Sequence, residues 1–393
     1  MYSRMIDKAP LLRLAMSMIL GIIVARYVLL PIPVLPVLVL MVLASLLLWR
    51  FENIQSMAIV ACVLFLGMFL MQHHQSDAEA EWPTASRIDR SKAFFIEQRG
   101  KLLERFADKR FDDDAYAVVA AMSLGDKSEL TPALKDTYSV SGASHVLALS
   151  GLHLGIIYML LSLFLPRRRW PALSQLVVIL VVWAFVFLVG MSVSVVRSAV
   201  MLTMYGLLSI GHREKMSINA LAFTAIVMLM WNPAWLFDVG FQMSFMAVLA
   251  ILMFVPLFND VFPAEYLMEH PWVRRVWGLV AVSCSAQLGV APLIAFYFSR
   301  FSTYFLLTNF IVVPAAFVIL WLSLVVMVFP SLAYLLYNIV QWLNAALGWI
   351  TTLPCSSING LHPSVVQVVL VYVLIFCIYL LIERLKRVSF CSQ

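Results

Sequence analysis

Continuous apolar segments alternate with short polar segments along the chain. No Asp, Glu, Lys or Arg occurs in the 82 residues from 301 to 382, and uncharged runs also cover 53–76, 137–166 and 170–196. Membrane barrel strands would alternate apolar and polar residues, so these continuous runs predict helices instead. We count about 12 spans of roughly 20 residues, at 11–30, 33–49, 55–72, 143–165, 172–189, 193–210, 217–231, 240–258, 275–298, 303–328, 332–352 and 364–382.

The composition agrees with a chain embedded in lipid. Of 393 residues, 63% are hydrophobic and 12% are charged, whereas soluble domains carry roughly 25% charged residues. This excludes a water-soluble enzyme, a disordered protein and a small disulfide scaffold. The five cysteines form no CxxC pair, so neither a zinc knuckle nor a redox motif is predicted. The predicted fold class is an all-α, polytopic helical integral membrane protein.

The basic residues predict the orientation of the chain. With 12 spans, fourteen Lys and Arg residues fall in short loops on the side of the N-terminus, and only Arg300 falls in the opposite short loops. The positive-inside rule then places both termini in the cytoplasm. The first apolar run lacks a small-residue cleavage site, so we expect a retained span of the cytoplasmic (inner) membrane.

One polar segment interrupts the apolar pattern. Residues 73–136 hold 23 of the 48 charged residues, and the topology puts them outside the cytoplasm. Within this segment, Phe95, Leu102 and Phe106 recur at helical spacing in the basic stretch 87–110. Two interpretations stay open: an amphipathic helix on the outer membrane surface, or a helix packed on the transmembrane bundle.

The stretch 124–158 combines small and polar residues with apolar ones. Two serine–glycine pairs, Ser141-Gly142 and Ser150-Gly151, accompany His145 and His153. Histidine at membrane depth is costly unless it faces protein or water. The two histidines are eight residues apart and share one face if the helix is continuous. They either pack through hydrogen bonds or line a polar path.

Further polar residues fall inside predicted spans. Arg197 cannot lose its charge and needs a carboxylate, a carbonyl or water. Asp238 lies at a comparable outer depth and is a candidate partner, although Arg197 also lies close enough to the interface to reach water. Gln242, Gln287 and Asn309 are uncharged and either bond across helices or add to a polar interior.

Three enzymatic interpretations fail on spacing. Ser150 and His153 are at i, i+3, which in a helix rarely points an imidazole at a hydroxyl, and Ala148-Leu149-Ser150-Gly151 lacks the first glycine of the GxSG pattern. Gly125-Asp126-Lys127-Ser128 lacks the full P-loop spacing. The cluster of His73, His74, Asp77 and Glu79 does not have the ligand spacing of a metal hydrolase. We interpret it as a solvated polar rim at the end of a span. We therefore expect no catalytic residue, metal or cofactor, and any energy for transport must come from a partner or an ion gradient.

Several ordered blocks resemble one known family. The stretch 124–157 is similar to the signature segment of the ComEC competence family, the inner-membrane DNA channel of natural transformation. The matching residues are Gly125-Asp126-Lys127-Ser128, Ser141-Gly142-Ala143-Ser144-His145, Ala148-Leu149-Ser150-Gly151-Leu152-His153, Val193-Ser194-Val195-Val196-Arg197-Ser198-Ala199, Asp238-Val239-Gly240-Phe241-Gln242-Met243-Ser244-Phe245, Ala286-Gln287, Ala291-Pro292-Leu293, Leu307-Thr308-Asn309 and Val313-Pro314.

The resemblance implies passage of single-stranded DNA into the cytoplasm, through a channel and not by an enzyme. Channel-lining or gating roles are then expected for His145, Ser150, Gly151, His153, Arg197, Asp238, Gln242, Gln287 and Asn309. Implied partners are single-stranded DNA, membrane lipids, a periplasmic DNA receptor, a cytoplasmic motor or single-strand-binding proteins, and a second copy in a homodimer. Two alternatives stay open: a solute or lipid transporter on the same core, and an intramembrane serine hydrolase.

The resemblance also suggests how the chain is divided. We expect N-terminal transmembrane hairpins at 1–72, a polar and amphipathic extracytoplasmic segment at 73–114, a competence-type channel domain at 115–385 and a cytoplasmic tail at 386–393. The OB-like domain and the metallo-β-lactamase-like domain of many members are not expected here, because the polar segment lacks the strand patterns of a five-stranded barrel and the sequence stops at Gln393.

Overall fold

The computed structural model describes residues 10–28, 34–47, 49–79, 87–106, 113–165, 170–210 and 218–391. The chain divides into two compact units, which are considered separately. Unit 1 comprises residues 1–89 and 199–242, and unit 2 comprises residues 90–198 and 243–393.

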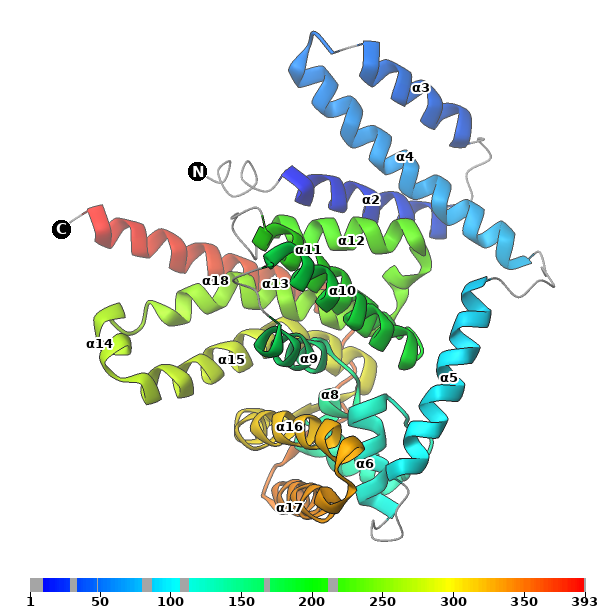
Figure 1. Cartoon of the computed structure of the whole chain (residues 1–393). Helices are drawn as coiled ribbons and strands as arrows, with labels where there is room; N and C mark the ends of the chain where they lie inside the picture. The colour runs from blue at the N-terminus through cyan, green and yellow to red at the C-terminus, as the bar shows by residue number, and fades with distance from the viewer. Residues whose placement is uncertain are drawn as a thin grey trace. The chain divides into compact units, whose positions relative to one another are not determined.

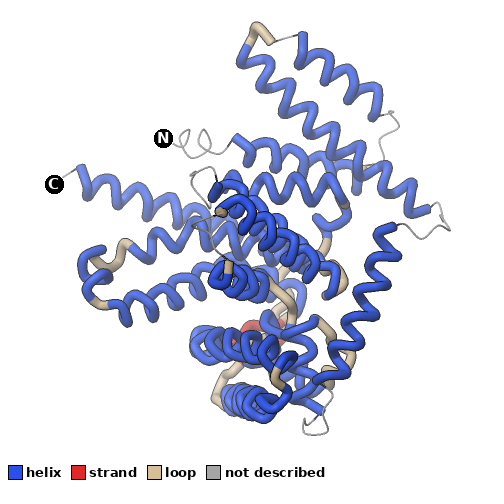
Figure 2. Tube along the Cα trace, in the orientation of Figure 1, coloured by secondary structure: helices blue, strands red, loops and turns tan. Residues whose placement is uncertain are grey.

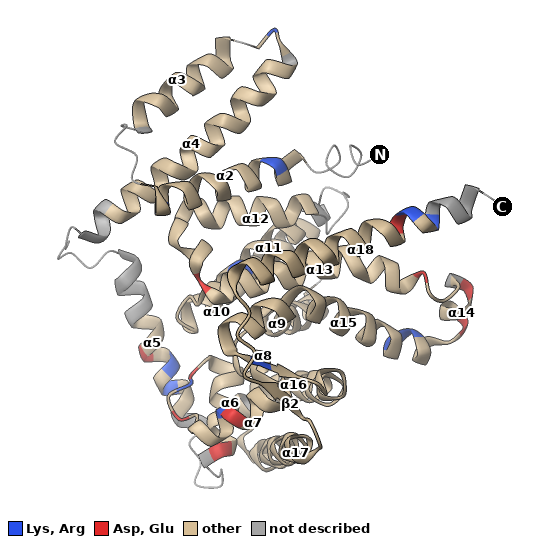
Figure 3. Ribbon diagram, turned by 180° about the vertical axis from the view of Figure 1, so that it is seen from behind, with Lys and Arg blue, Asp and Glu red and all other residues tan. Residues whose placement is uncertain are grey.

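Helices account for nearly all of the described residues (Figures 1 and 2). The described strands are β1 (Arg300–Ser302) and β2 (Ser357–Asn359), which pair antiparallel with Phe301 opposite Ile358. Apart from α5, charged residues are sparse along the long helices, and those of α18 (Val365–Cys391) lie in its last turns (Figure 3). The predicted all-α membrane fold is confirmed.

The other helices follow in chain order. Unit 1 contains α2 (Pro10–Tyr27), α3 (Val34–Leu47), α4 (Glu52–Glu79), α12 (Ile218–Trp231) and η1 (Pro233–Phe237). Unit 2 contains α6 (Asp113–Leu124), α7 (Pro132–Ser141), α8 (Ser144–Leu147), α9 (Gly151–Phe164), α10 (Pro171–Leu188), α14 (Ala264–Glu269), α15 (Pro271–Phe298), α16 (Phe305–Val328), η2 (Pro330–Leu332), α17 (Ala333–Thr352) and α18. Three helices contain a unit boundary: α5 (Arg87–Phe106), α11 (Val193–Ile210) and α13 (Val239–Asn259).

The helices that can cross a membrane are fewer than the apolar segments suggested. Among described residues, seven helices are long and apolar enough: Pro10–Tyr27, Asn53–Gln75, Pro171–Leu188, Val239–Asn259, Pro271–Phe298, Phe305–Met327 and Val365–Lys386. The spans predicted at 33–49, 193–210 and 217–231 correspond to shorter apolar helices. The remaining two predicted spans are 143–165, which is divided between α8 and α9, and 332–352, which corresponds to the more polar α17.

Two glycines bring α2 and α4 of unit 1 together. A side chain at Gly21 would clash with the Leu64 carbonyl, and one at Gly67 would clash with the Met18 carbonyl. The Ser17 hydroxyl also donates to the Val60 carbonyl at 2.7 Å. Because lipid offers no hydrophobic drive for helix association, close contact at small residues stabilises such a pair instead.

A short buried helix lies in the core of unit 2. In α6, Ala117, Val118 and Ala121 are 0% exposed and belong to the cluster that also contains residues of α16 and α17. No separate helix was predicted here from the sequence: residues 73–136 were described as one polar segment, and the expected channel domain began at 115. The apolar run of α6 is part of the core.

The amphipathic helix predicted in the polar segment is present as α5. Leu103 is buried in the core of unit 2, and the Phe95 ring stacks on Phe187 with centroids 5.7 Å apart. Phe94 and Ile96 are exposed. These contacts favour packing on the helices of unit 2. The side chain of Phe106 and residues 107–110 lie outside the described part of the chain.

Three helices of unit 2 meet at one glycine of α15. A side chain at Gly289 would clash with the Met246 carbonyl and approach the Ala250 Cβ to 2.7 Å, both on α13. The Tyr372 hydroxyl of α18 donates to the Gly289 carbonyl at 2.8 Å. By contrast, a side chain at Gly278 of α15 would meet nothing within 4 Å.

The same substitution in α15 should therefore have opposite effects at these two glycines. Gly278→Ala should stabilise the protein by up to ~1 kcal/mol, because alanine is the better helix former. Gly289→Ala should destabilise it by about 1–3 kcal/mol, because the methyl group overpacks the contact with α13. Unfolding of the two purified variants in detergent measures both effects. Equal effects of the two variants would contradict the tight α13–α15 contact.

Candidate functional site

A break in the helix lies within the segment that combines serine–glycine pairs with histidines. The helix α8 ends at Leu147, Ala148 and Ser150 have extended backbone, and α9 begins at Gly151. The condition under which His145 and His153 would share one helix face, a continuous helix, is therefore not met. The polar backbone at the break needs partners inside the protein.

The chain before the break is held by hydrogen bonds to α16. Gly142 ends α7 with φ +86, a left-handed conformation that favours glycine, and a side chain there would approach Ser302 to 2.9 Å. The Thr308 hydroxyl donates to the Ser141 carbonyl at 2.6 Å, and both residues are fully buried. This bond fixes the C-terminal end of α7.

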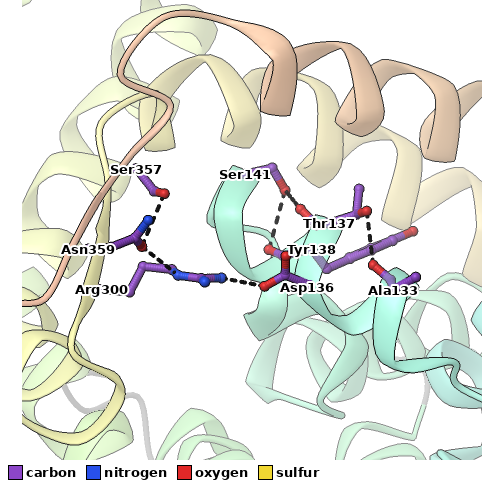
Figure 4. A network of polar contacts seen from close by, with 8 residues as sticks. All are labelled: Ala133, Asp136, Thr137, Tyr138, Ser141, Arg300, Ser357 and Asn359. Atoms are coloured by element: carbon purple, nitrogen blue, oxygen red, sulfur yellow. Dashed lines mark hydrogen bonds and ion pairs between the residues drawn. The ribbon is translucent and has the colours of Figure 1, made fainter.

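An exposed polar network continues from α7 to the two strands (Figure 4). The Arg300 guanidinium of β1 bonds Asp136 of α7 at 2.6 Å and Asn359 of β2 at 2.8 Å. The one basic residue predicted in a short outer loop is thus paired with an acidic residue of the polar segment. The network joins loops that are far apart in sequence.

A compact turn precedes α7 in the Gly125–Ser128 block. The Asp126 carboxylate accepts hydrogen bonds from the Ser128 amide at 3.1 Å and the Ser128 hydroxyl at 2.8 Å. Burial alone would raise the pKa of Asp126, but these two bonds and the charge of Arg99 outweigh it and lower the pKa. Asp126 therefore stays ionised and stabilises the turn, with no phosphate loop formed.

Ser150 and His153 are brought together at the start of α9. The His153 Nδ1 accepts the Ser150 backbone N–H at 3.2 Å and lies 3.1 Å from the Ser150 Oγ. The argument that an i, i+3 pair would not meet is wrong, because Ser150 precedes the helix in extended backbone. The bond from the Ser150 amide is one half of a capping box.

This contact serves the fold better than it would serve hydrolysis. The ring nitrogen next to the serine already accepts the backbone amide. The other nitrogen, Nε2, is buried and has no hydrogen-bond partner among described residues. A nucleophile needs a base that is itself oriented by a third group, and no such group is present within the described residues. In that same part of the chain, no cluster of three His, Cys, Asp or Glu residues is suited to a metal.

Arg197 lies against the first residue of α9. Its side chain is 6% exposed, and its Nη2 donates to the Ser198 hydroxyl at 3.2 Å. A side chain built at Gly151 would come within 3.1 Å of the Ser198 Oγ and 3.7 Å of the Arg197 Nη2. Four predicted residues thus lie at the start of α9 or against it: Ser150, Gly151 and His153 belong to its cap and first turn, and Arg197 lies against Gly151.

The other predicted residues lie elsewhere. In unit 1, the Asp238 carboxylate accepts the Phe241 amide at 2.8 Å, and the Gln242 side chain donates to the Leu236 carbonyl at 3.0 Å. These bonds shape the start of α13. In unit 2, the His145 Nδ1 lies 3.1 Å from the Gly142 carbonyl, while Gln287 and Asn309 are half-buried on α15 and α16. The suggested Arg197–Asp238 pair joins the two units and stays a prediction.

Sequence reasoning did not single out two contributors to this site. Ser198 is 4% exposed and bonds Arg197, and Thr308 anchors Ser141 from α16. Both residues stand in blocks of the family resemblance, next to Arg197 and Asn309 respectively. Their contacts become visible only when α9, α11 and α16 are placed in space.

The family model described as Competence protein matches residues 122–385. The chain belongs to the competence protein family. The match includes the break between α8 and α9, the residues around Arg197 and the glycine contact of α15. Together with the seven apolar helices, this membership indicates a protein of the inner membrane.

Curated relatives share parts of the chain. ComE operon protein 3 of Bacillus subtilis is 27% identical over 294 residues, which cover 71% of this chain and 36% of that protein. Recombination protein 2 of Haemophilus influenzae is 25% identical over 208 residues, covering 50% of this chain and 26% of its own length. An uncharacterised protein of Aquifex aeolicus is 32% identical over 198 residues, or 50% of this chain and 44% of that protein. The chain thus matches less than half the length of each relative, and no solved structure matches it.

The capping role of Ser150 predicts that this serine does not react as a nucleophile. A fluorophosphonate probe should leave Ser150 unlabelled in the purified protein, because His153 presents an occupied nitrogen to it. Mass spectrometry of the peptide that contains residue 150 measures the extent of labelling, and the Ser150→Ala variant is the negative control. Stoichiometric labelling that disappears in the alanine variant would establish the hydrolase alternative instead.

Proposed function

We propose that this protein forms the inner-membrane channel through which one strand of DNA enters the cytoplasm during natural transformation. The proposal rests on membership of the competence protein family over residues 122–385. Two of the chain's relatives are named ComE operon protein 3 and Recombination protein 2. We carry this role to the present chain as a proposal, because the relatives are much longer.

The arrangement at the helix break supports this role. A spanning helix needs no polar side chains of its own in lipid, yet His153, Arg197 and Ser198 are each buried, and the last two lie against Gly151 beside the break. Ionisable groups at such depth generally mark a path for ions or substrates. A strand of DNA carries one negative charge per nucleotide, so a buried cation beside its path lowers the cost of crossing the membrane.

The binding of such a substrate must stay weak. A channel has to release each group that it binds, so a few polar contacts serve transport better than a deep basic groove. We propose that His145, Ser150, Gly151, His153, Arg197, Asp238, Gln242, Gln287 and Asn309 line or gate this path. A periplasmic DNA receptor would deliver the strand, a cytoplasmic motor or single-strand-binding protein would draw it in, and a second copy of the chain in a homodimer is part of the proposal.

Loss of the gene should leave DNA outside the inner membrane. Fluorescent double-stranded DNA should reach the cytoplasm of host cells only when the wild-type protein is present. Arg197→Ala should reach the membrane and lower entry by about tenfold or more, since a hydrogen bond to a charged group contributes roughly 1.5–3 kcal/mol. Arg300→Ala is the matched control, because it removes an equal charge from an exposed pair.

One result would contradict the channel, and another would contradict only the role of Arg197. Unchanged entry in the deletion strain would favour a transporter of another solute or lipid on the same core. Normal entry with Arg197→Ala would remove Arg197 from the path.

We also propose that both termini face the cytoplasm. The proposal rests on the 12 spans predicted from the sequence, which put fourteen short-loop basic residues on that side and one on the other. After Gln393, a fused cytoplasmic fluorescent protein should be active and a fused alkaline phosphatase inactive. Within 87–106, the fluorescent protein should be inactive and the phosphatase active. A periplasmic C-terminus would overturn the assignment.

A further inference from the structure

Buried hydrogen-bond donors without an acceptor among the described residues occur in the first turn of α9 and on the arginine that lies against it. The Nε2 of His153 and the Nε and Nη1 of Arg197 are buried, and none of them has a hydrogen-bond partner among the described residues. His153 is 0% exposed and Arg197 is 6% exposed. Buried polar groups are almost always paired, so three unpaired donors at one place call for a physical explanation.

The hydrogen bond from Ser150 fixes the proton of His153. Since the Ser150 amide donates to Nδ1 at 3.2 Å, the lone pair of Nδ1 is occupied. The proton of the neutral ring must then reside on Nε2. His153 therefore presents a buried N–H donor, not an acceptor.

The guanidinium of Arg197 is left with an uncompensated charge in unit 2. Its neighbour Ser198 supplies one acceptor at 3.2 Å, and the Ser198 hydroxyl itself donates to the Ser194 carbonyl at 2.9 Å. No carboxylate among the described residues of unit 2 forms an ion pair with Arg197. A buried cation without a counter-charge is strongly destabilising.

The helix end adds to the same positive field. The N–H groups of Gly151 and Leu152 precede the first hydrogen bond within α9, so they need acceptors outside the helix. The helix has 14 residues, and its dipole makes this end positive. The absence of a side chain at Gly151 lets the guanidinium approach, as the 3.7 Å distance from a built Cβ to Nη2 indicates.

Donors of three kinds thus lie in the first turn of α9 or on the arginine against it, and among the described residues of unit 2 no negative group matches them. A planar guanidinium binds two oxygens of a phosphate at once, and a helix N-terminus binds a third through backbone N–H groups. The turn is also accessible: Ser150 and Gly151 are half-buried, and Leu152 is 36% exposed. A tetrahedral oxyanion fits this donor set better than a spherical halide does.

We propose that Arg197, His153 and the first turn of α9 bind one phosphate group, and that in the working protein this is a phosphodiester of the transported strand. The second part rests on the proposed function. A nucleic-acid phosphate is favoured over a lipid headgroup, because the donors are buried inside unit 2 and not spread on its surface.

Inorganic phosphate tests the site without DNA. The full chain in detergent is titrated with sodium phosphate against sodium chloride at constant ionic strength, and the unfolding temperature is followed. Phosphate should raise this temperature in the wild-type protein. In Arg197→Gln, phosphate should no longer raise the unfolding temperature. Arg197→Lys should bind phosphate about tenfold more weakly, because a single ammonium charge replaces the planar guanidinium with its several donors. Arg300→Gln should respond to phosphate as the wild type does.

Two variants of His153 separate binding from folding. His153→Asn keeps an acceptor near the position of Nδ1 for the Ser150 amide but deletes the Nε2 donor, and should weaken phosphate binding by about tenfold. His153→Gln keeps a donor near the position of Nε2 and should stay within about threefold of the wild type. A phosphate response that is equal in the wild type, Arg197→Lys and His153→Asn would overturn the site.

An oligonucleotide tests the identity of the phosphate. A thymidine 12-mer should compete with inorganic phosphate, whereas an uncharged methylphosphonate 12-mer and a short-chain phosphatidylglycerol should not. Removing Arg197 should reduce the slope of log affinity against log salt by about 0.7, the contribution of one phosphate of a single strand. If phosphate binds through Arg197 but only the lipid competes, the nucleic-acid assignment is wrong and the oxyanion site stands. If phosphate fails to bind while DNA entry depends on this protein, the site is wrong and the channel stands.

Discussion

The hydrogen bond between the Ser150 amide and the His153 ring is the contact on which the candidate site depends. Lipid offers no partner for a free backbone amide, so a break in a membrane helix survives only where the protein supplies one. His153 supplies it at 3.2 Å. The same bond commits the Nε2 of the ring to be a donor, in the first turn of a helix whose first residue lies against Arg197. One local contact therefore stabilises the break and sets the chemistry beside it.

The surroundings of unit 2 hold this break in place. Thr308 of α16 fixes the end of α7 through the Ser141 carbonyl, and the buried α6 packs in the same core as α16 and α17. On the other helices, Gly289 allows α13 and α15 to approach closely while Tyr372 of α18 bonds its carbonyl. In lipid, such small-residue contacts and buried hydrogen bonds replace the hydrophobic effect as the source of helix association.

Sequence patterns predicted much of the fold and some of the site. The fold class, the helix at 87–106 and the family were all readable, because continuous apolar runs, helical spacing and ordered motifs are local properties. The number of spans could not be predicted in the same way. The helices α3, α9, α11 and α12 are apolar but short, and the predicted span 143–165 is broken at Ser150. No separate helix was predicted for α6, which lies in the core of unit 2.

What the sequence by itself determined is the set of groups that must be satisfied in lipid: histidines, an arginine and serine–glycine pairs in apolar surroundings. Tertiary structure decided how each is satisfied. The i, i+3 spacing of Ser150 and His153 suggests no contact in a helix, yet they meet because Ser150 lies before the helix. Likewise, only the approach of α11 to Gly151 places Arg197 at the end of α9. The physical reason is that a buried donor finds its partner across the fold, at distances along the chain that no local pattern records.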